Sequence, residues 1–365
     1  MAPELFIEAF MSYFNSHHLR IAEFNVENLF VRLDHLADFE KYQHIDFEKI
    51  TEREWQRLST STVPNKPIAQ VRRIAKAIRD IDADILMLCE VGGRESLANF
   101  SRYFLGDEYL VHLIEGNSDR GIDLGYLVRR KLPFKYDLVS HKQRSIDFLY
   151  PHERLTQETG YAHLRSAKRT SHKFSRDVLE LRVFEEEESV EETPILAPVL
   201  ILLLVHLKSQ LDRNRIDPQG RDRRKAELEK LVKIYKEIHN EFSGQTPVLL
   251  AGDFNGIASK PTPDSEFEAL YRDTKLSDCL EVAKVPSDER FTHMQIHRNR
   301  IGVNKQLDYI FVPPELNGRV NSQETWVYRY KDEFGMTQVI PKNLGEKRLL
   351  PSDHYPVILT LDKGE

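Results

Sequence analysis

Several apolar segments of strand length in this 365-residue chain adjoin a side chain that can bind a metal ion or a phosphate group. These side chains belong to Asn25, Glu27, Glu90, His206, Asp253, Asn255, Asp308, Asp353 and His354. A polar group next to a buried strand costs free energy unless a partner satisfies it. The repeated pattern therefore predicts one shared polar centre at the ends of the strands.

The oxygen-bearing members of this set predict a divalent metal site. Mg²⁺ prefers carboxylate and amide oxygens, and Mn²⁺ accepts the same ligands. Glu90 is the strongest ligand candidate, because an unpaired carboxylate behind an apolar run costs several kcal/mol. Asn25, Glu27 and Asp353 are the further candidates.

The histidines and the remaining polar residues suit acid–base chemistry at a phosphate. His206 and His354 can act near neutral pH on the leaving group and on the attacking water. Asp308 is suited to orient His354 and raise its basicity, while Asp253 can orient or deprotonate the water. Asn255 can donate a hydrogen bond to a phosphate oxygen as negative charge develops.

Each residue also has a structural explanation when it is taken singly. Asn25 and Asp308 resemble cap or turn residues, and a lone His206 is typical of a hydrogen-bonded core histidine. The pair His293 and His297 suggests a metal, but their strand-like context argues against a zinc site. The prediction of a functional site therefore rests on the whole set rather than on any member.

Hydrophobic periodicity predicts alternating strands and helices along the chain. The expected strands are 19–26, 84–91, 109–115, 124–129, 178–184, 199–207, 247–252, 306–312 and 355–361, and the expected helices are 67–81, 96–105 and 222–242. This order suggests one α/β domain over 19–365 behind an N-terminal extension, 1–18. The segments 34–65 and 138–172 are predicted to contain the loops that select the substrate.

The composition narrows the class of protein. The chain is 40% hydrophobic and 30% charged, with a net charge of −6, so a nucleic acid would have to meet a local basic face. A small phosphorylated substrate is the alternative. No apolar run approaches the roughly 20 residues of a membrane span, no signal peptide is evident, and only two cysteines occur. These features predict a cytoplasmic protein without a transmembrane segment.

The motifs and their order resemble those of the endonuclease/exonuclease/phosphatase superfamily, which includes deoxyribonucleases, sphingomyelinases and inositol-phosphate phosphatases. The resemblance covers about residues 19–361. Within the superfamily, the bacterial nuclease-like members are the most similar to this sequence. It rests on Phe24-Asn25-Val26-Glu27-Asn28-Leu29, Leu88-Cys89-Glu90-Val91, Val205-His206-Leu207-Lys208-Ser209, Gly252-Asp253-Phe254-Asn255, Leu307-Asp308-Tyr309-Ile310 and Ser352-Asp353-His354-Tyr355-Pro356-Val357.

The resemblance implies a four-layered α/β sandwich of two packed, mostly antiparallel sheets flanked by helices. It also implies that Glu90 binds the metal and that Asp308 pairs with His354. The position of His206 is histidine in deoxyribonuclease-like members and asparagine in abasic-site endonucleases, which points away from abasic-site repair. Arg176 is similar to a family position that contacts phosphate. Lys208, or an arginine among Arg221, Arg223 and Arg224, is expected to hold the non-scissile phosphate.

Together these features predict an Mg²⁺-dependent phosphodiester hydrolase, a nuclease that cleaves DNA or RNA by in-line attack of an activated water. One alternative is a phosphatase or phosphodiesterase acting on an inositol phosphate, a sphingomyelin-like lipid or a nucleotide. The other is a non-catalytic binding protein on the same fold. The sequence leaves the oligomeric state open, with a monomer favoured.

Overall fold

The computed structural model describes residues 17–34, 42, 44–158, 171–185, 197–212, 215–296 and 302–363. Nearly all of the predicted N-terminal extension lies outside these residues, and so do His297 and parts of the segments 34–65 and 138–172. No helix among the described residues is both long enough and apolar enough to cross a membrane.

Two six-stranded sheets form the centre of the molecule. The first sheet has the order β13-β14-β1-β2-β4-β3, with strands Trp326–Val327, Val357–Leu361, Leu19–Leu29, Ile85–Val91, Asp123–Arg129 and Tyr109–His112. The second has the order β5-β6-β7-β8-β12-β9, with strands Phe134–Ser140, Val178–Glu185, Leu200–His206, Val248–Asp253, Asp308–Val312 and Ser277–Asp278. A separate pair joins β10 (His293–Gln295) to β11 (Val303–Lys305).

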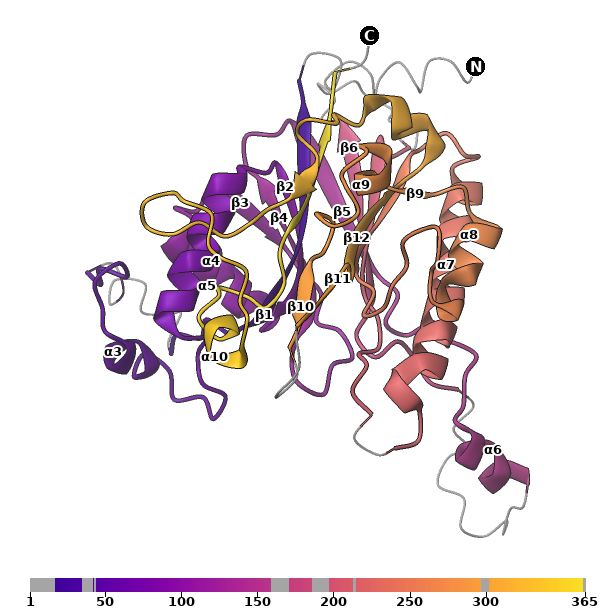
Figure 1. The fold of residues 1–365 in the computed structure, drawn as a ribbon, viewed down its shortest axis with the longest axis horizontal. Helices are drawn as coiled ribbons and strands as arrows, with labels where there is room; N and C mark the ends of the chain where they lie inside the picture. The colour runs from indigo at the N-terminus through magenta and orange to yellow at the C-terminus, as the bar shows by residue number, and fades with distance from the viewer. Residues whose placement is uncertain are drawn as a thin grey trace, which may run out of the picture.

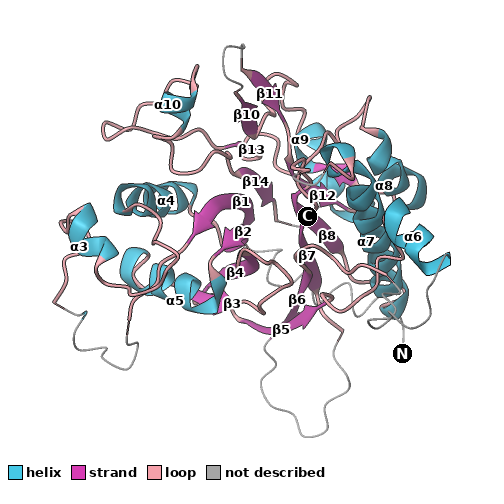
Figure 2. Ribbon diagram, turned by 90° about the horizontal axis from the view of Figure 1, so that it is seen from below, coloured by secondary structure: helices cyan, strands magenta, loops and turns pink. Residues whose placement is uncertain are grey.

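Helices cover the outer faces of both sheets, which gives four layers (Figures 1 and 2). α4 (Ile68–Ile81) and α5 (Gly93–Phe104) lie on the first sheet, and α7 (Arg221–Glu241) and α8 (Glu268–Asp273) lie on the second. The shorter helices are α3 (Glu52–Gln56), α6 (Pro151–Glu158), α9 (Cys279–Val282) and α10 (Leu344–Lys347), with 3₁₀ turns η1 (Pro218–Gly220), η2 (Ser265–Phe267) and η3 (Pro314–Arg319). The predicted α/β sandwich is confirmed.

Apolar patterning explains this layering. β7 is buried at every residue, as expected of a strand covered on both faces. α7 buries Leu228, Leu231, Ile234 and Ile238 against the second sheet. Most of its charged residues are exposed, but Arg224 and Glu227 are buried. One core lies between the two sheets and under α4 and α5, and a second lies between the second sheet and α7.

Each sheet contains one parallel pair among antiparallel neighbours. β1 runs parallel to β2, and β7 runs parallel to β8, with His206 paired to Asp253. The carboxyl ends of these four strands meet at one edge of the sandwich, which Figure 2 views from below. This edge is where the sequence predicted the polar centre.

One expectation about the strand ends needs correction. β1 continues to Leu29 rather than ending at 26, so Glu27 lies within the strand. Asn25 and Glu90 lie within β1 and β2, as the expected ranges 19–26 and 84–91 had them. The register of both strands shifts near these ends, and Glu27 and Glu90 have φ angles of 47° and 65°. Such irregularities re-aim side chains at the rim of a sheet.

The segment 138–172 also differs from expectation at its start. Residues 138–140 belong to β5 rather than to a loop, and α6 follows at Pro151–Glu158. β5 lies at the edge of its sheet and carries exposed Lys135 and Asp137. Its apolar pattern is therefore too weak to identify it from sequence. The segment 34–65 contains the short helix α3.

Candidate active site

The strand register brings three of the predicted residues together on the second sheet. Asp253 at the end of β8 pairs with His206 of β7 on one side and with Asp308 of β12 on the other. From the first sheet, the Asn25 amide Nδ2 donates to Asp253 Oδ2 over 3.1 Å. The two sheets are therefore joined through polar side chains at this edge.

His354 forms a buried pair with Asp308. Its Nδ1 lies 2.8 Å from Asp308 Oδ2, and Asp308 is fully buried. Ser352 holds the backbone in place, because its Oγ accepts from the His354 N–H over 3.1 Å and donates to the Asn25 carbonyl over 2.6 Å. Burial alone would lower the pKa of His354, but the charge and hydrogen bond of Asp308, with the charges of Asp353 and Asp253, raise it well above its usual value.

His206 has the opposite electrostatic environment. Its Nε2 lies 3.4 Å from Asp253 Oδ2 and 3.9 Å from Glu90 Oε1. Burial, followed by the positive charges of Arg176, His354 and Arg120, lowers the pKa of His206 well below its usual value. The two environments therefore favour different protonation states, a cation at His354 and a neutral ring at His206.

Asp253 is the carboxylate at the centre of the cluster. Burial and then the charge of Asp308 raise its pKa to about 7, against the lowering effect of His354 and of the backbone N–H of Asn255. That N–H donates to Asp253 Oδ1 over 2.8 Å. The Asn255 side chain donates to the Leu207 carbonyl over 3.1 Å from a left-handed backbone with φ of 52°. A carboxyl group with a pKa near 7 is suited to exchange a proton with water at neutral pH.

The predicted metal ligands lie on the first sheet's side of the edge. Glu90 is the most available of them. Among the described residues its carboxylate has one ion-pair contact, with His206 Nε2, and that contact is long at 3.9 Å. Glu27 Oε2 accepts from the Asp353 N–H over 3.1 Å, and Asn25 Oδ1 accepts from the Glu27 N–H over 3.0 Å.

A lysine that the sequence analysis missed enters this acidic group. Lys66 exposes 4% of its side chain; its Nζ donates to the Glu27 carbonyl over 2.7 Å and lies 3.8 Å from Glu27 Oε2. Burial lowers the pKa of Lys66, while the charges of Glu27, Asp353 and Glu90 act to raise it. The ammonium group therefore supplies positive charge beside the predicted metal ligands.

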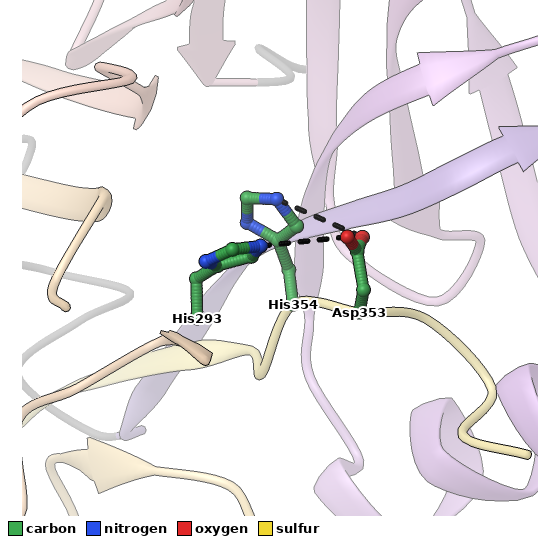
Figure 3. A group of neighbouring side chains, drawn as sticks. All are labelled: His293, Asp353 and His354. Carbon is green, nitrogen blue, oxygen red and sulfur yellow. Dashed lines mark ion pairs between the residues drawn. The ribbon is translucent and has the colours of Figure 1, made fainter. Parts of the chain in front are cut away.

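Asp353 has the basic side chains of His293, Lys347 and His354 on its other side. Its Oδ2 lies 3.4 Å from His293 Nε2 and 3.2 Å from Lys347 Nζ, and its Oδ1 lies 3.8 Å from His354 Nε2. Figure 3 shows the two rings of His293 and His354 beside the Asp353 carboxylate. Burial alone would raise the pKa of Asp353, but the hydrogen bond from His293 and the charges of His354, His293 and Lys347 lower it.

The donor chemistry of the edge fits a divalent cation. Within the described residues, potential ligand atoms of Asp253, Asp308 and His354 lie within 4.8 Å of one another, and so do those of His293, Asp353 and His354. Because a protonated His354 cannot bind a metal, the carboxylates are the oxygen donors these groups offer. Glu90 adds a carboxylate to this edge with no hydrogen bond recorded in the described part of the chain. Oxygen donors of this kind suit a hard cation such as Mg²⁺.

The two predicted substrate-binding residues line a cavity beside this cluster. Arg176 is 7% exposed, and its Nη1 donates to the Leu207 carbonyl and to Ser175 Oγ over 3.4 and 3.3 Å. Lys208 donates from Nζ to the carbonyls of Leu211 and Ser209. All eleven predicted residues thus lie at or next to one edge, with Lys208 the most peripheral.

Sequence reasoning missed four contributors to the site: Lys66, Glu23, His293 and Lys347. Glu23 is fully buried; burial, then the charges of Asp308 and Asp253, raise its pKa well above the usual value. A glutamate in the middle of an apolar strand is the one signal that pointed to Glu23. His293 was considered and set aside, and no local pattern marks Lys66 or Lys347.

The fold and this edge define a class of α/β sandwiches that present acidic and imidazole groups at one end of two packed sheets. Residues 24–354 match the model of the Endonuclease/Exonuclease/phosphatase family, and the chain belongs to that family. Its members are metal-dependent hydrolases of phosphoesters. The predicted family is confirmed.

Solved structures of TDP2 share the fold. Truncated TDP2 from Caenorhabditis elegans aligns over 96% of this chain and 100% of that chain, at 16% identity and a TM-score of 0.53. TDP2 from D. rerio, solved with a single-strand DNA product, aligns over 95% and 99%, at 14% identity and a TM-score of 0.52. An endonuclease/exonuclease/phosphatase family protein from Bacteroides thetaiotaomicron aligns over 94% and 98%, at 14% identity and a TM-score of 0.49. No curated protein sequence matches the chain.

Proposed function

We propose that the protein hydrolyses a phosphodiester bond in nucleic acid and that Mg²⁺ is its metal. The observation that carries this proposal is the pair of buried groups with opposed protonation preferences, the His354 imidazolium beside Asp308 and the Asp253 carboxyl with a pKa of about 7. When the surroundings of two titratable groups give them different protonation states at the same pH, one group can act as an acid and the other as a base.

Asp253 is the proposed general base. The ordinary pKa of an aspartate is near 4, which makes it a weak acceptor, whereas a value of about 7 matches a proton acceptor at neutral pH. The Asn255 backbone N–H and the Asn25 amide hold both oxygens of Asp253 in place. Water beside Asp253 loses its proton to this carboxylate as it attacks phosphorus.

His354 is the proposed cation at the scissile phosphate. Asp308 fixes its Nδ1, so Nε2 is the nitrogen left to donate to a phosphate oxygen or to protonate the leaving oxygen. His206 is neutral and donates a hydrogen bond without delivering a proton. Mg²⁺ held by Glu90, with Asn25 and Glu27 nearby, would supply a Lewis acid that neutralises phosphate charge.

Nucleic acid is favoured over a small phosphoester by the positive side chains that line the cavity next to the site. The D. rerio TDP2 structure, which contains a single-strand DNA product, makes DNA the first substrate to test. Both cysteines are buried and unpaired, which supports a reducing compartment, and we propose the cytoplasm.

A cleavage panel tests the proposal. The purified protein is incubated with single- and double-stranded DNA, RNA, a nucleotide and an inositol phosphate, with Mg²⁺ and with EDTA, beside the His354→Ala variant. The proposal expects Mg²⁺-dependent cleavage of at least one nucleic acid, with a large loss in the variant. Turnover of the small phosphoesters alone would contradict it.

A further inference from the structure

The first two turns of α7 hold the chain at the ends of β6 and β7. α7 lies along the outer face of the second sheet (Figure 2), and its residues Arg224 and Glu227 are buried. Their side chains bond to the backbone just before the start of β6 and just after the end of β7. A helix outside the sheet is thereby linked to the two segments that carry Arg176 and His206.

The Glu227 carboxylate accepts one backbone hydrogen bond from each segment. Its Oε1 accepts from the Ser175 N–H over 2.8 Å, and its Oε2 accepts from the Lys208 N–H over 2.7 Å. The pairing of β6 with β7 ends at Val178 and Val205. If that register continued, Ser175 would lie opposite Lys208. The carboxylate therefore lies between two backbone segments that have stopped pairing and replaces the ladder between them.

Two arginines of the same turns complete this attachment. Arg224 Nη1 donates to the Lys208 carbonyl over 3.0 Å, while its Nε and Nη2 donate to the buried carboxylate of Glu266. Arg223 Nε lies 3.4 Å from Glu227 Oε1 and balances its charge. Both backbone polar groups of Lys208 are thus bonded to buried, charged side chains of α7.

The backbone held in this way adjoins groups that act at the catalytic edge. His206 Nδ1 is buried without a hydrogen-bond partner in the described part of the chain, so the direction of this ring depends on the backbone that follows it. The Leu207 carbonyl, one residue further on, accepts from the side chains of Asn255 and Arg176. A shift of the backbone at Lys208 would therefore displace all three of these side chains.

Stability alone does not account for a buried network of this kind. Charges are costly to remove from water, and well-packed apolar side chains of similar volume often stabilise a fold as much or more. A carboxylate offers something that an apolar side chain lacks, two acceptor oxygens at a fixed separation.

We propose that Glu227 is a positioning residue for the reaction at this edge. Its carboxylate fixes the backbone at the ends of β6 and β7 and so sets the places of His206 and Asn255. The inference rests on the proposed phosphodiesterase activity and adds to it a residue that lies on the helix behind the sheet.

A glutamine variant tests the role in catalysis. Glu227→Gln keeps the length of the side chain but removes its charge and one of its two acceptors. Hydrolysis of bis(p-nitrophenyl) phosphate with Mg²⁺ is measured for the parent and the variant. In Glu227→Gln, kcat should fall about 10-fold or more while KM changes less than about threefold, because misplaced groups that act on the transition state lower kcat.

Two control variants separate positioning from stability. Glu180→Gln removes another fully buried carboxylate of the second sheet, one whose partners are His141 and Arg182. Glu229→Gln changes an exposed residue of α7. Both controls should keep the kcat of the parent.

Amide hydrogen exchange and histidine NMR locate the change without relying on turnover. At least one of the Ser175 and Lys208 N–H groups should exchange about 10-fold faster in Glu227→Gln than in the parent. The ring signals of His206 should shift in this variant and stay in place in Glu180→Gln. If the glutamine variant does not fold, Glu227→Asp replaces it; its carboxylate is one methylene too short to reach both N–H groups, so the same changes are expected.

The outcomes distinguish this inference from the proposed activity. A kcat in Glu227→Gln within about threefold of the parent, or equal losses of kcat in Glu227→Gln and Glu180→Gln, would overturn the inference and leave the proposed activity intact. Absence of p-nitrophenol release by the parent would count against the proposed activity. The exchange rates and the His206 signals would then decide the role of Glu227, and unchanged values would overturn it.

Discussion

Replacement of Asp308 by asparagine tests the origin of the charge on His354. The fully buried Asp308 carboxylate lies 2.8 Å from His354 Nδ1, and asparagine preserves its shape but removes its charge. The pKa of His354 should fall in the variant, because burial lowers it and Asp308 is the largest of the influences that raise it.

The loss of activity follows from the strength of a charged hydrogen bond. Such a bond contributes about 1.5–3 kcal/mol. If the charge acts on the transition state, losing the bond corresponds to a roughly 10- to 150-fold decrease in kcat/KM. The loss should shrink at lower pH, where the His354 of the variant regains its proton.

Stability should respond to pH in a defined direction. The folded-state pKa of His354 is raised, so the pair stabilises the fold fully below the unfolded value of about 6.5 and loses this contribution as pH rises through the folded value. In EDTA, Asp308→Asn should therefore cost the most stability, about 2 kcal/mol, near pH 6 and progressively less in alkaline solution.

The assay combines steady-state hydrolysis, urea unfolding over a pH series, and NMR titration of the histidines. Glu180→Gln is the matched control, because Glu180 forms a similar buried pair with His141 at 2.8 Å, away from the catalytic edge. It should lower stability and leave kcat/KM near the parent value. An unchanged His354 pKa in Asp308→Asn, or equal losses of activity in the two variants, would refute the reasoning.

Three further predictions concern the base, the buried lysine and the packing behind it. With Asp253 as base, kcat/KM should rise with pH and level off at or below about pH 7, because a bound cation can only lower the metal-free pKa of about 7; a rise continuing well above pH 8 would exclude Asp253. Lys66→Met should destabilise the metal-free protein by about 2 kcal/mol. Because Glu27 and Asp353 lose their ammonium partner, Mg²⁺ should raise the melting temperature of this variant more than that of the parent. Equal Mg²⁺-induced shifts in the two proteins would contradict this role of Lys66. Trp55→Ala should cost about 3–5 kcal/mol in urea unfolding, because the indole is fully buried and donates to the Lys66 carbonyl over 2.8 Å; a loss below about 1 kcal/mol would show that the packing of α3 contributes little.

The parts of the fold that sequence predicts are those with long apolar patterns. β2, β7, β8 and α7 carry uninterrupted or helical periodicity, and the structure places them within a residue or two of the expected ranges. β9, β10, β11 and β13 have only two or three residues each. So short a strand has no period to detect, and its pairing is set by neighbours distant in sequence.

The same distinction separates the site residues that were predicted from those that were not. Glu90, His206 and Asp253 interrupt buried runs, where a polar side chain is costly and therefore conspicuous. Lys66 precedes a helix with no unusual local feature, and its position depends on Glu27 and on Trp55. His293 reaches the site through a bridge between its backbone and that of His354, 61 residues later in the chain.

Backbone irregularity also limited the prediction. The positive φ angles of Glu27, Glu90 and Asn255 turn their side chains toward the edge. A residue other than glycine rarely adopts this conformation, and strain of this kind is found at functional sites. A pattern of apolar residues contains no information about such angles.

The proposed role of Glu90 in metal binding has a direct test. Mg²⁺ binding is measured by calorimetry and hydrolysis of bis(p-nitrophenyl) phosphate by absorbance, for the parent, Glu90→Gln and the control Glu95→Gln on the exposed face of α5. We expect Glu90→Gln to unfold at the parent temperature or above, to bind Mg²⁺ at least about 10-fold more weakly and to lose nearly all hydrolysis, while Glu95→Gln matches the parent. Mg²⁺ binding and hydrolysis at parent levels in Glu90→Gln would contradict this role.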